Sequence, residues 1–277
     1  MSSVSWPVGG AVFLGAEIMD KKSVKKKYKD RKRELKRRYR ESLDALNEEY
    51  RQDLNTVIEA SGRPSPIDPP KRSTLEEIGN GVTHCVGSVF SVVALVFMLV
   101  FAEGTEEYVS ALIYSFGLLV MFTMSCLYHA FPHGSAVKRL FRRFDYSCIY
   151  LLIGATFAPI LLAYVGGTFG LVFLIVQWAV IATGITFVGI YGPTRLRFLH
   201  IPLYVALGWV GIMLLPTMVE NGDFGFLGFI LGGGVVYSLG IIPFVLKRKG
   251  AHFIWHFFVL AGAVVQWVGI FTTIYLA

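Results

Sequence analysis

The sequence predicts an all-α fold, namely a polytopic membrane protein built as a bundle of seven transmembrane helices. Three observations support this prediction. The 277 residues are 54% hydrophobic and only 16% charged, whereas about a quarter of a soluble domain is charged. Seven long apolar runs follow one another after residue 75, and spanning a bilayer takes roughly 17–25 apolar residues. The charge precedes these runs, because 17 of the 26 Lys and Arg residues lie before Ile78.

The chain divides into three segments. Residues 1–62 form a basic, partly helical N-terminal arm, with thirteen basic residues between Lys21 and Arg40. From Leu35 to Val57, Leu, Tyr and Val recur every three or four residues, which predicts a helix with one narrow apolar stripe. Residues 63–74 read as a Pro-rich linker, and residues 75–277 hold the seven spans.

The first span follows directly on the linker, and Gly166 and Gly167 separate the third span from the fourth. Prolines inside the runs are tolerated in membrane helices, because neighbouring groups can satisfy the freed backbone. The expected spans are residues 79–101, 108–131, 145–165, 169–191, 198–218, 225–246 and 252–276.

The basic residues of the membrane domain predict its orientation. They fall between spans two and three, four and five, and six and seven, so that with seven spans they share one face with the basic arm. Short basic loops are retained in the cytoplasm. We therefore expect a cytoplasmic N-terminus and a C-terminus on the opposite side. No basic region precedes the mildly apolar first twenty residues, which argues against a cleaved signal peptide.

The arm has three interpretations. It could fix topology and attract anionic lipid headgroups, at about 1 kcal/mol per Lys or Arg. Its apolar stripe could mediate self-association into a homo-oligomer. Binding of nucleic acid is the weakest interpretation and is not expected, because no aromatic platform or known motif accompanies the charge.

A polar cluster is predicted where three spans meet at one depth. His252 and His256 are four residues apart on span seven and leave one helix face. His129 lies near the end of span two, with Ser125 one turn before it, and Asp145 opens span three. Neutral imidazole suits zinc, and three protein ligands are usual in a catalytic zinc site. The alternative is a set of histidines that are hydrogen-bonded among helices.

Two further groups of residues lie in or beside the apolar runs. Glu77, Asn80 and His84 share a face of span one, where we expect hydrogen bonds to adjacent helices, and ligation of a metal by His84 is the less favoured alternative. The cysteines, which lie in apolar stretches without a CxxC pair, exclude a cysteine zinc site and a disulfide framework. They are Cys85, Cys126 and Cys148.

These motifs resemble the progestin and adipoQ receptor family, most closely its bacterial haemolysin III branch. Glu77 to His84 match the family's E-x-x-N-x-x-T-H opening of span one, and Ser125 to His129 match its S-x-x-x-H. The block from Phe144 to Pro159 resembles the family's third span, and the HxxxH of span seven completes the set. The resemblance covers about residues 75–277 and leaves the arm outside.

The resemblance implies a zinc ion held by His129, His252 and His256, with Asp145 handling the proton of a water and Ser125 supplying a hydrogen bond. It suggests a zinc-dependent intramembrane hydrolase, ceramidase-like, that cleaves an amide or ester of a membrane lipid and opens to the cytoplasmic leaflet.

Two alternatives stay open at this point. One is a lipid-sensing receptor or membrane-homeostasis protein with a structural zinc. The other is a haemolysin-like permeabilising protein, although no span has the polar stripe of a water-filled lumen. Closeness to the bacterial branch and the lack of a targeting segment favour a bacterial inner membrane.

Overall fold

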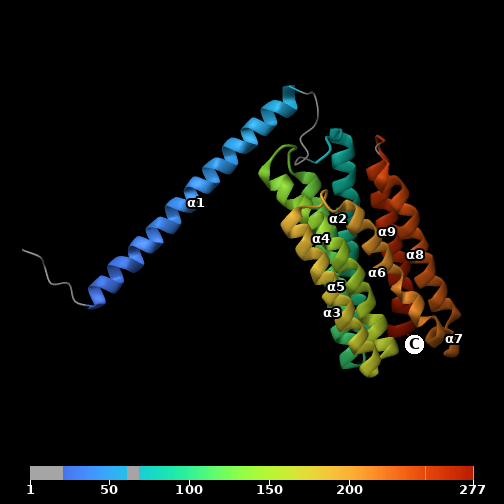
Figure 1. The fold of residues 1–277 in the computed structure, drawn as a ribbon. Coiled ribbons are helices and arrows are strands. Elements are labelled where there is room, and N and C mark those ends of the chain that lie inside the picture. Colours follow the sequence, from blue (N-terminus) through green and yellow to red (C-terminus); the bar gives the residue numbers. More distant parts are fainter. Residues whose placement is uncertain (1–20, 61–68, 247, 277) are drawn as a thin grey trace, which may run out of the picture. The chain divides into compact units, whose positions relative to one another are not determined.

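A computed structural model describes residues 21–60, 69–246 and 248–276. These residues are almost entirely helical, and none of them forms a strand (Figure 1). They belong to two units, divided after Ser65, which are described separately here. The first twenty residues and positions 63–68 of the expected linker lie outside the described residues.

Helix α1 (Lys21–Ala60) carries the basic stretch of the arm. Ion pairs one turn apart support it: Arg37 and Arg38 lie 2.9 and 3.0 Å from Glu34, and pairs at this spacing stabilise helices. Their hydrogen bonds lower the pKa of the Glu34 carboxyl. The apolar stripe is exposed at Leu35 and Tyr39.

The membrane domain confirms the seven-span prediction: among the described residues, seven helical segments are long and apolar enough to cross a membrane. Two of them end in π-helical turns, at Ile160–Val165 and Phe271–Tyr275. The segments are α2 (Thr74–Phe101), α3 (Thr105–Ala130), α4 (Ala136–Pro159), α5 (Gly167–Tyr191), α6 (Arg197–Trp209) continued through a 3₁₀ turn (Val210–Leu214) into α7 (Leu215–Glu220), α8 (Phe224–Val245) and α9 (Ala251–Ile270).

Helix α4 begins nine residues before its expected start at residue 145. Ser135 caps it by accepting a hydrogen bond from the backbone N–H of Lys138. The expected loop between spans two and three is therefore helical in most of its length, and two of its basic side chains, Lys138 and Arg142, are buried. Hydropathy detects only the apolar part of a helix, which explains the difference. The orientation across the membrane stays a prediction.

Close helix packing positions the functional end of the bundle. Helix α3 packs between α2 and α4, and α9 packs against both α2 and α8. A Cβ atom on Gly117 would lie 2.2 Å from the Cβ of Ala155, and one on Gly87 would lie 2.3 Å from the Phe122 ring. Glycine therefore permits the close approach of α3 to both of its neighbours.

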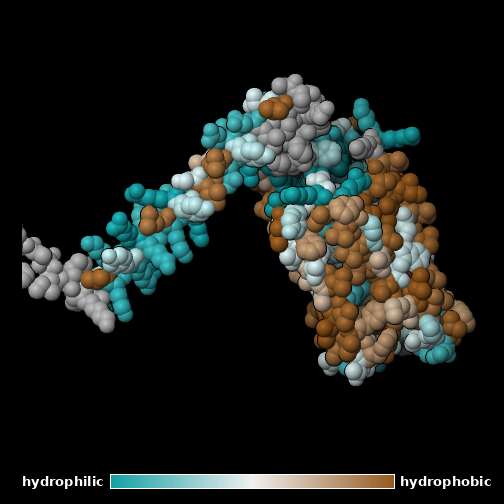
Figure 2. All heavy atoms as spheres, in the orientation of Figure 1, coloured by the Kyte–Doolittle hydropathy of each residue, from teal (hydrophilic) through white to brown (hydrophobic). Residues whose placement is uncertain are grey.

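The outer faces of the spans are apolar. Side chains such as Val82 and Val89 on α2 and Ile175 on α5 are more than half exposed. Figure 2 shows a broad hydrophobic belt over these helices, with polar residues gathered toward the ends. An apolar surface of this extent is unlike that of a soluble protein and suits lipid.

Candidate metal centre

Helix ends bring the polar residues together. Helices α2, α4 and α9 begin at the end of the bundle where α3 ends (Figure 1). Ser73 and Glu76 form a capping box at the start of α2. Glu76 also accepts a short hydrogen bond from the backbone N–H of Gly250, which precedes α9 with a left-handed φ of 75°. This contact links the starts of α2 and α9 and sets their relative height.

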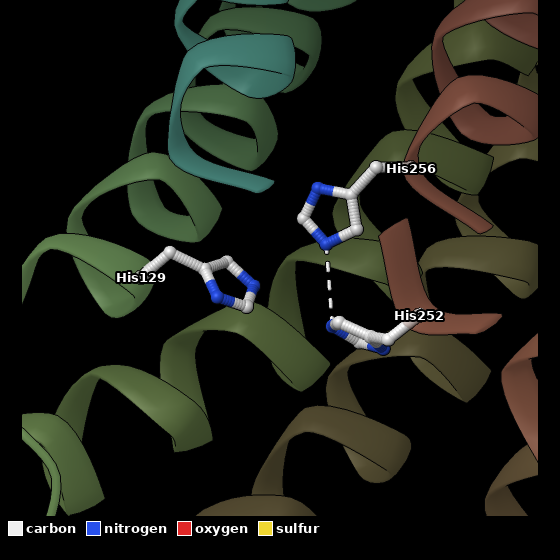
Figure 3. Close-up of side chains that lie close together, drawn as sticks. All are labelled: His129, His252 and His256. Atoms are coloured by element: carbon white, nitrogen blue, oxygen red, sulfur yellow. Dashed lines mark hydrogen bonds between the residues drawn. The ribbon is translucent and has the colours of Figure 1, made fainter. Parts of the chain in front are cut away.

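Three histidines converge at this level, one from α3 and two from α9. One ring nitrogen from each of His129, His252 and His256 lies within 4.8 Å of the others. His129 and His256 are buried and His252 is partly exposed. Figure 3 shows the imidazoles facing a common space, with 3.2 Å between the Nε2 atoms of His252 and His256. Three nitrogens so close together could hold one metal ion.

The surroundings of His129 suit a ligand role. Its Nδ1 lies 2.6 Å from Oε2 of Glu77, so an Nδ1–H donates to the carboxylate and leaves the Nε2 lone pair free. This Nε2 is buried and has no hydrogen-bond partner among the described residues. A carboxylate behind a histidine fixes its tautomer and orientation in metal sites. The unpartnered nitrogen is what a cation would satisfy.

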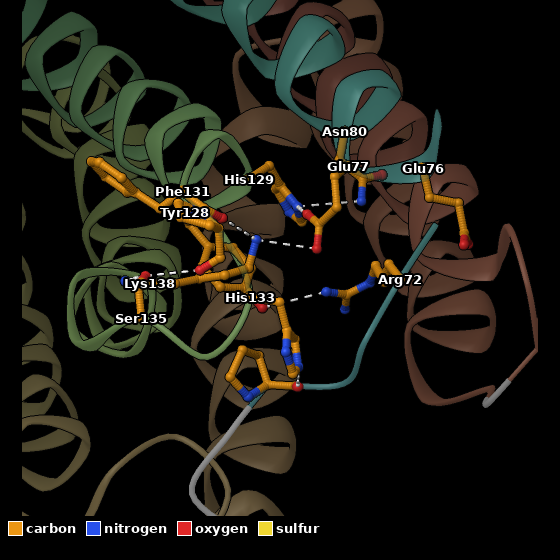
Figure 4. Close-up of polar contacts among 12 residues, drawn as sticks. Arg72, Glu76, Glu77, Asn80, Tyr128, His129, Phe131, His133, Ser135 and Lys138 are labelled. Carbon is orange, nitrogen blue, oxygen red and sulfur yellow. Dashed lines mark hydrogen bonds and ion pairs between the residues drawn. The ribbon is translucent and has the colours of Figure 1, made fainter. Parts of the chain in front are cut away.

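The negative charge of Glu77 is compensated by Lys138, a residue that the sequence analysis assigns to a loop. Lys138 Nζ lies 3.1 Å from Oε1 of Glu77 and donates to the carbonyl of Phe131 at 2.9 Å. Asn80 Nδ2 lies 3.4 Å from Nδ1 of His129. Figure 4 shows this chain of contacts running from α2 across the end of α3 to α4. The network holds His129 in place from the side opposite to the other histidines.

His84 packs on the cluster from α2. Its ring stacks on His256, with 3.8 Å between centroids, and meets Phe122 edge-on. Neither of its nitrogens has a hydrogen-bond partner in the described part of the chain, and it is not among the three residues whose ligand atoms converge. All three residues expected on one face of span one thus face the histidines.

Ser125 and Asp145 lie beside the histidines. Ser125 is buried one turn before His129, and its Oγ has no hydrogen-bond partner among the described residues. Asp145 lies in the third turn of α4 and is partly exposed. Both side chains line an internal cavity, together with His84 and His256.

Two cavities meet at this site. The inner cavity, of about 120 Å³, is mostly apolar and runs between α4, α6, α8 and α9. The basic cavity, of about 410 Å³, opens at the end of the bundle and reaches His252. Asp145, Tyr146 and Phe244 line both cavities. The histidines therefore lie where an apolar space adjoins a positively charged one.

The sequence interpretation missed Lys138 and Arg142 as parts of the site. Lys138 and Arg142 are four residues apart, and this spacing places two side chains on the same face of a helix. The prediction of a loop between spans two and three concealed that spacing.

Comparison with known proteins places the chain in a family. The model of haemolysin-III-related proteins matches residues 72–267. The hemolysin-3 homolog of Bacillus subtilis (strain 168) is 33% identical over 192 residues, 68% of this chain and 89% of that protein. The human monocyte to macrophage differentiation factor is 27% identical over 213 residues, 74% and 87% of the two chains. The match excludes α1 and includes the whole cluster. The chain belongs to the haemolysin-III-related family of multi-pass membrane proteins.

Proposed function

We propose that this protein is a zinc-dependent intramembrane hydrolase that cleaves an amide or ester bond of a membrane lipid, with a ceramide-like molecule as the simplest substrate. One observation carries the proposal. Of the three convergent histidines, His256 lines an apolar cavity and His252 lines the open polar cavity that adjoins it. A lipid carbonyl, which joins an apolar chain to a polar head, would lie at such a junction.

Zinc is the metal that the donor set favours. Three imidazole nitrogens suit zinc, and three protein ligands leave a fourth position open in catalytic sites. The residues fit, because His129 Nε2 is buried without a hydrogen-bond partner among the described residues and two further nitrogens lie 3.2 Å apart. When bound, zinc would supply Lewis-acid polarisation of a carbonyl and acidification of water.

The remaining residues have roles that follow from their positions. Asp145 lines both cavities, so its carboxylate can accept a proton from the attacking water and return it to the leaving group. Ser125 can donate a hydrogen bond into the inner cavity, where its side chain also interacts with Asp145. The apolar lining of α4, α6 and α8 can hold an acyl chain and exclude bulk water.

The cellular setting is part of the proposal. The relatives from Bacillus and the basic residues at the histidine end support a bacterial inner membrane with the site toward the cytoplasm. Helix α1 would contact anionic headgroups through its Lys and Arg side chains, or a second α1 through its exposed stripe.

The test is release of fatty acid from purified protein incubated with a panel of ceramides and acyl esters. We expect release that is lost in Asp145→Asn while metal content stays unchanged. A variant with His252→Ala and His256→Ala should lose both. No release from fully metal-loaded wild type across the panel would refute the hydrolase proposal.

A second candidate is a lipid-binding receptor or homeostasis protein with a structural zinc. It is supported by the way the cluster joins three helices: Glu77 and His84 from α2 contact histidines of α3 and α9. Under this candidate, Asp145→Asn would leave function unchanged, and loss of the histidines would lower the unfolding temperature. A permeabilising activity, suggested by the name of the Bacillus cereus relative, Hemolysin-3, would show as dye leakage from liposomes.

A further inference from the structure

The basic cavity has a lining that is strongly cationic. Among the described residues, two carboxylates, Glu76 and Asp145, line it beside the cations. Glu76 is engaged by the backbone N–H groups of Ser73 and Gly250. Asp145 has no Lys, Arg or His nitrogen within 4.0 Å in the described part of the chain. The cations are Lys71, Arg72, Arg142, Arg197, Arg248 and Lys249.

Among these cations, Arg142 gives the strongest indication that the cavity binds an anion. Its side chain is only 6% exposed, yet within the described residues its guanidinium has neither a hydrogen-bond partner nor a carboxylate within 4.0 Å. Its guanidinium lies 6.0 Å from the ring of Tyr146 and interacts electrostatically with Asp145 beyond ion-pair distance. A buried charge without a counter-ion in contact with it is costly. The side chain lines the basic cavity, so an anion there would compensate it.

Two neighbours are similarly placed. Arg197 lies 5.8 Å from the Phe244 ring, and within the described part of the chain Arg72 donates only to the hydroxyl of Tyr128, at 3.3 Å. Neither has a carboxylate within 4.0 Å among the described residues. Three guanidinium groups of the described residues therefore line one cavity with no carboxylate in contact, and Asp145 interacts with Arg72 and Arg142 only at longer range. Guanidinium binds phosphate oxygens with two parallel hydrogen bonds.

We propose that the basic cavity binds the phosphate headgroup of a lipid whose hydrocarbon chain occupies the inner cavity. The two cavities share Asp145, Tyr146 and Phe244, so a ligand that fills both passes the histidines. A phosphate group offers three or more acceptor oxygens to several guanidinium groups at once. A neutral headgroup would leave Arg142 uncompensated. Charges that only set topology are expected to face solvent and headgroups, which a buried Arg142 does not.

This inference narrows the proposed substrate from a ceramide-like molecule with a neutral headgroup to a lipid with a phosphate headgroup, and in that respect it rests on the proposed function. Its test needs neither metal nor turnover. Binding of the phosphate lipid, together with no fatty acid release across the panel of ceramides and acyl esters, would therefore refute the hydrolase and leave the headgroup site standing.

The experiment measures binding of dodecyl phosphate to the full chain in a non-ionic detergent, by calorimetry and by the fluorescence of Trp209 and Trp255, which line the inner cavity. Arg142→Gln removes the buried charge. Arg143→Gln is the matched control, because Arg143 is the adjacent residue of α4, exposed, and absent from the lining of both cavities. Dodecanol and inorganic phosphate are titrated in parallel.

We expect Arg142→Gln to weaken the binding of dodecyl phosphate roughly tenfold or more. The affinity of Arg143→Gln should stay within about twofold of wild type. Neither change should alter the binding of dodecanol. Inorganic phosphate should bind far more weakly than dodecyl phosphate. Equal losses in both variants, or no loss in Arg142→Gln, would overturn the site. Inorganic phosphate binding as tightly as the lipid would overturn the lipid assignment. If Arg142→Gln does not fold, Arg72→Gln, at a partly exposed side chain, carries the same expectation.

Discussion

Glu77 and His129 are joined by a hydrogen bond of 2.6 Å between Oε2 and Nδ1. The bond runs from the first span to the second and directs the other nitrogen of the imidazole toward the two histidines of α9. The motif at the start of span one is thus tied to metal binding through an orienting contact.

Removing this carboxylate should weaken the metal site without removing a ligand. For Glu77→Ala we expect zinc affinity to fall about 10–100-fold, the usual effect of losing such a partner, and Glu77→Gln should retain more because its amide oxygen can still accept from Nδ1–H. Competition with a fluorescent chelator measures this. Glu107→Gln, a carboxylate change at the opposite end of the bundle, is the control. Wild-type affinity in Glu77→Ala would contradict an orienting role.

Lys138 should be needed for stability more than for metal binding. Its side chain is 1% exposed, and Lys138→Met leaves Glu77 without its cation. Breaking a buried pair from one side costs about 3 kcal/mol, which a denaturing-detergent titration can resolve. Lys249→Met, at an exposed lysine, should change the unfolding free energy by less than about 0.5 kcal/mol. Equal stability of the two variants would show that the ion pair at 3.1 Å contributes nothing.

The sequence predicted the seven spans and all three convergent histidines, because long apolar runs and HxxxH spacing are local signals. The histidines could be expected at one depth in the membrane because His129 and His252 each lie near a helix end that the apolar runs define. The pairing of Glu77 with Lys138 could not be predicted, since it depends on where α4 begins, and hydropathy does not mark that point. The basic cavity depends on side chains from five separate segments and has no local signal.

Substitutions of His84 test whether this residue packs against the histidine cluster or binds the metal. It stacks on His256 at 3.8 Å between centroids but is not among the convergent ligands. We expect His84→Phe, which preserves a flat ring, to keep the metal stoichiometry of wild type. His84→Ala should weaken metal binding modestly, because His256 loses the ring that supports it. Metal analysis and chelator competition separate these effects. Complete loss of metal in His84→Phe would instead make His84 a ligand.

The contact of α3 with α4 should tolerate no added methyl group. A Cβ on Gly117 would meet the Cβ of Ala155 at 2.2 Å, so Gly117→Ala should destabilise the bundle by about 1–3 kcal/mol. Adding Ala155→Gly should restore much of the loss, which a double-mutant cycle would reveal as coupling. Gly228→Ala, where nothing lies within 4 Å, is the control. Additive effects of the two changes would contradict direct contact.

The metal itself is tested most directly by elemental analysis of protein purified in detergent without chelators. Wild type should contain about one zinc per chain, and the variant with His252→Ala and His256→Ala should contain none while it remains folded by circular dichroism. Asp145→Asn should retain its zinc. A metal-free wild type, or a double variant that keeps its zinc, would contradict a metal centre at these histidines and leave a hydrogen-bonded cluster in a seven-span bundle.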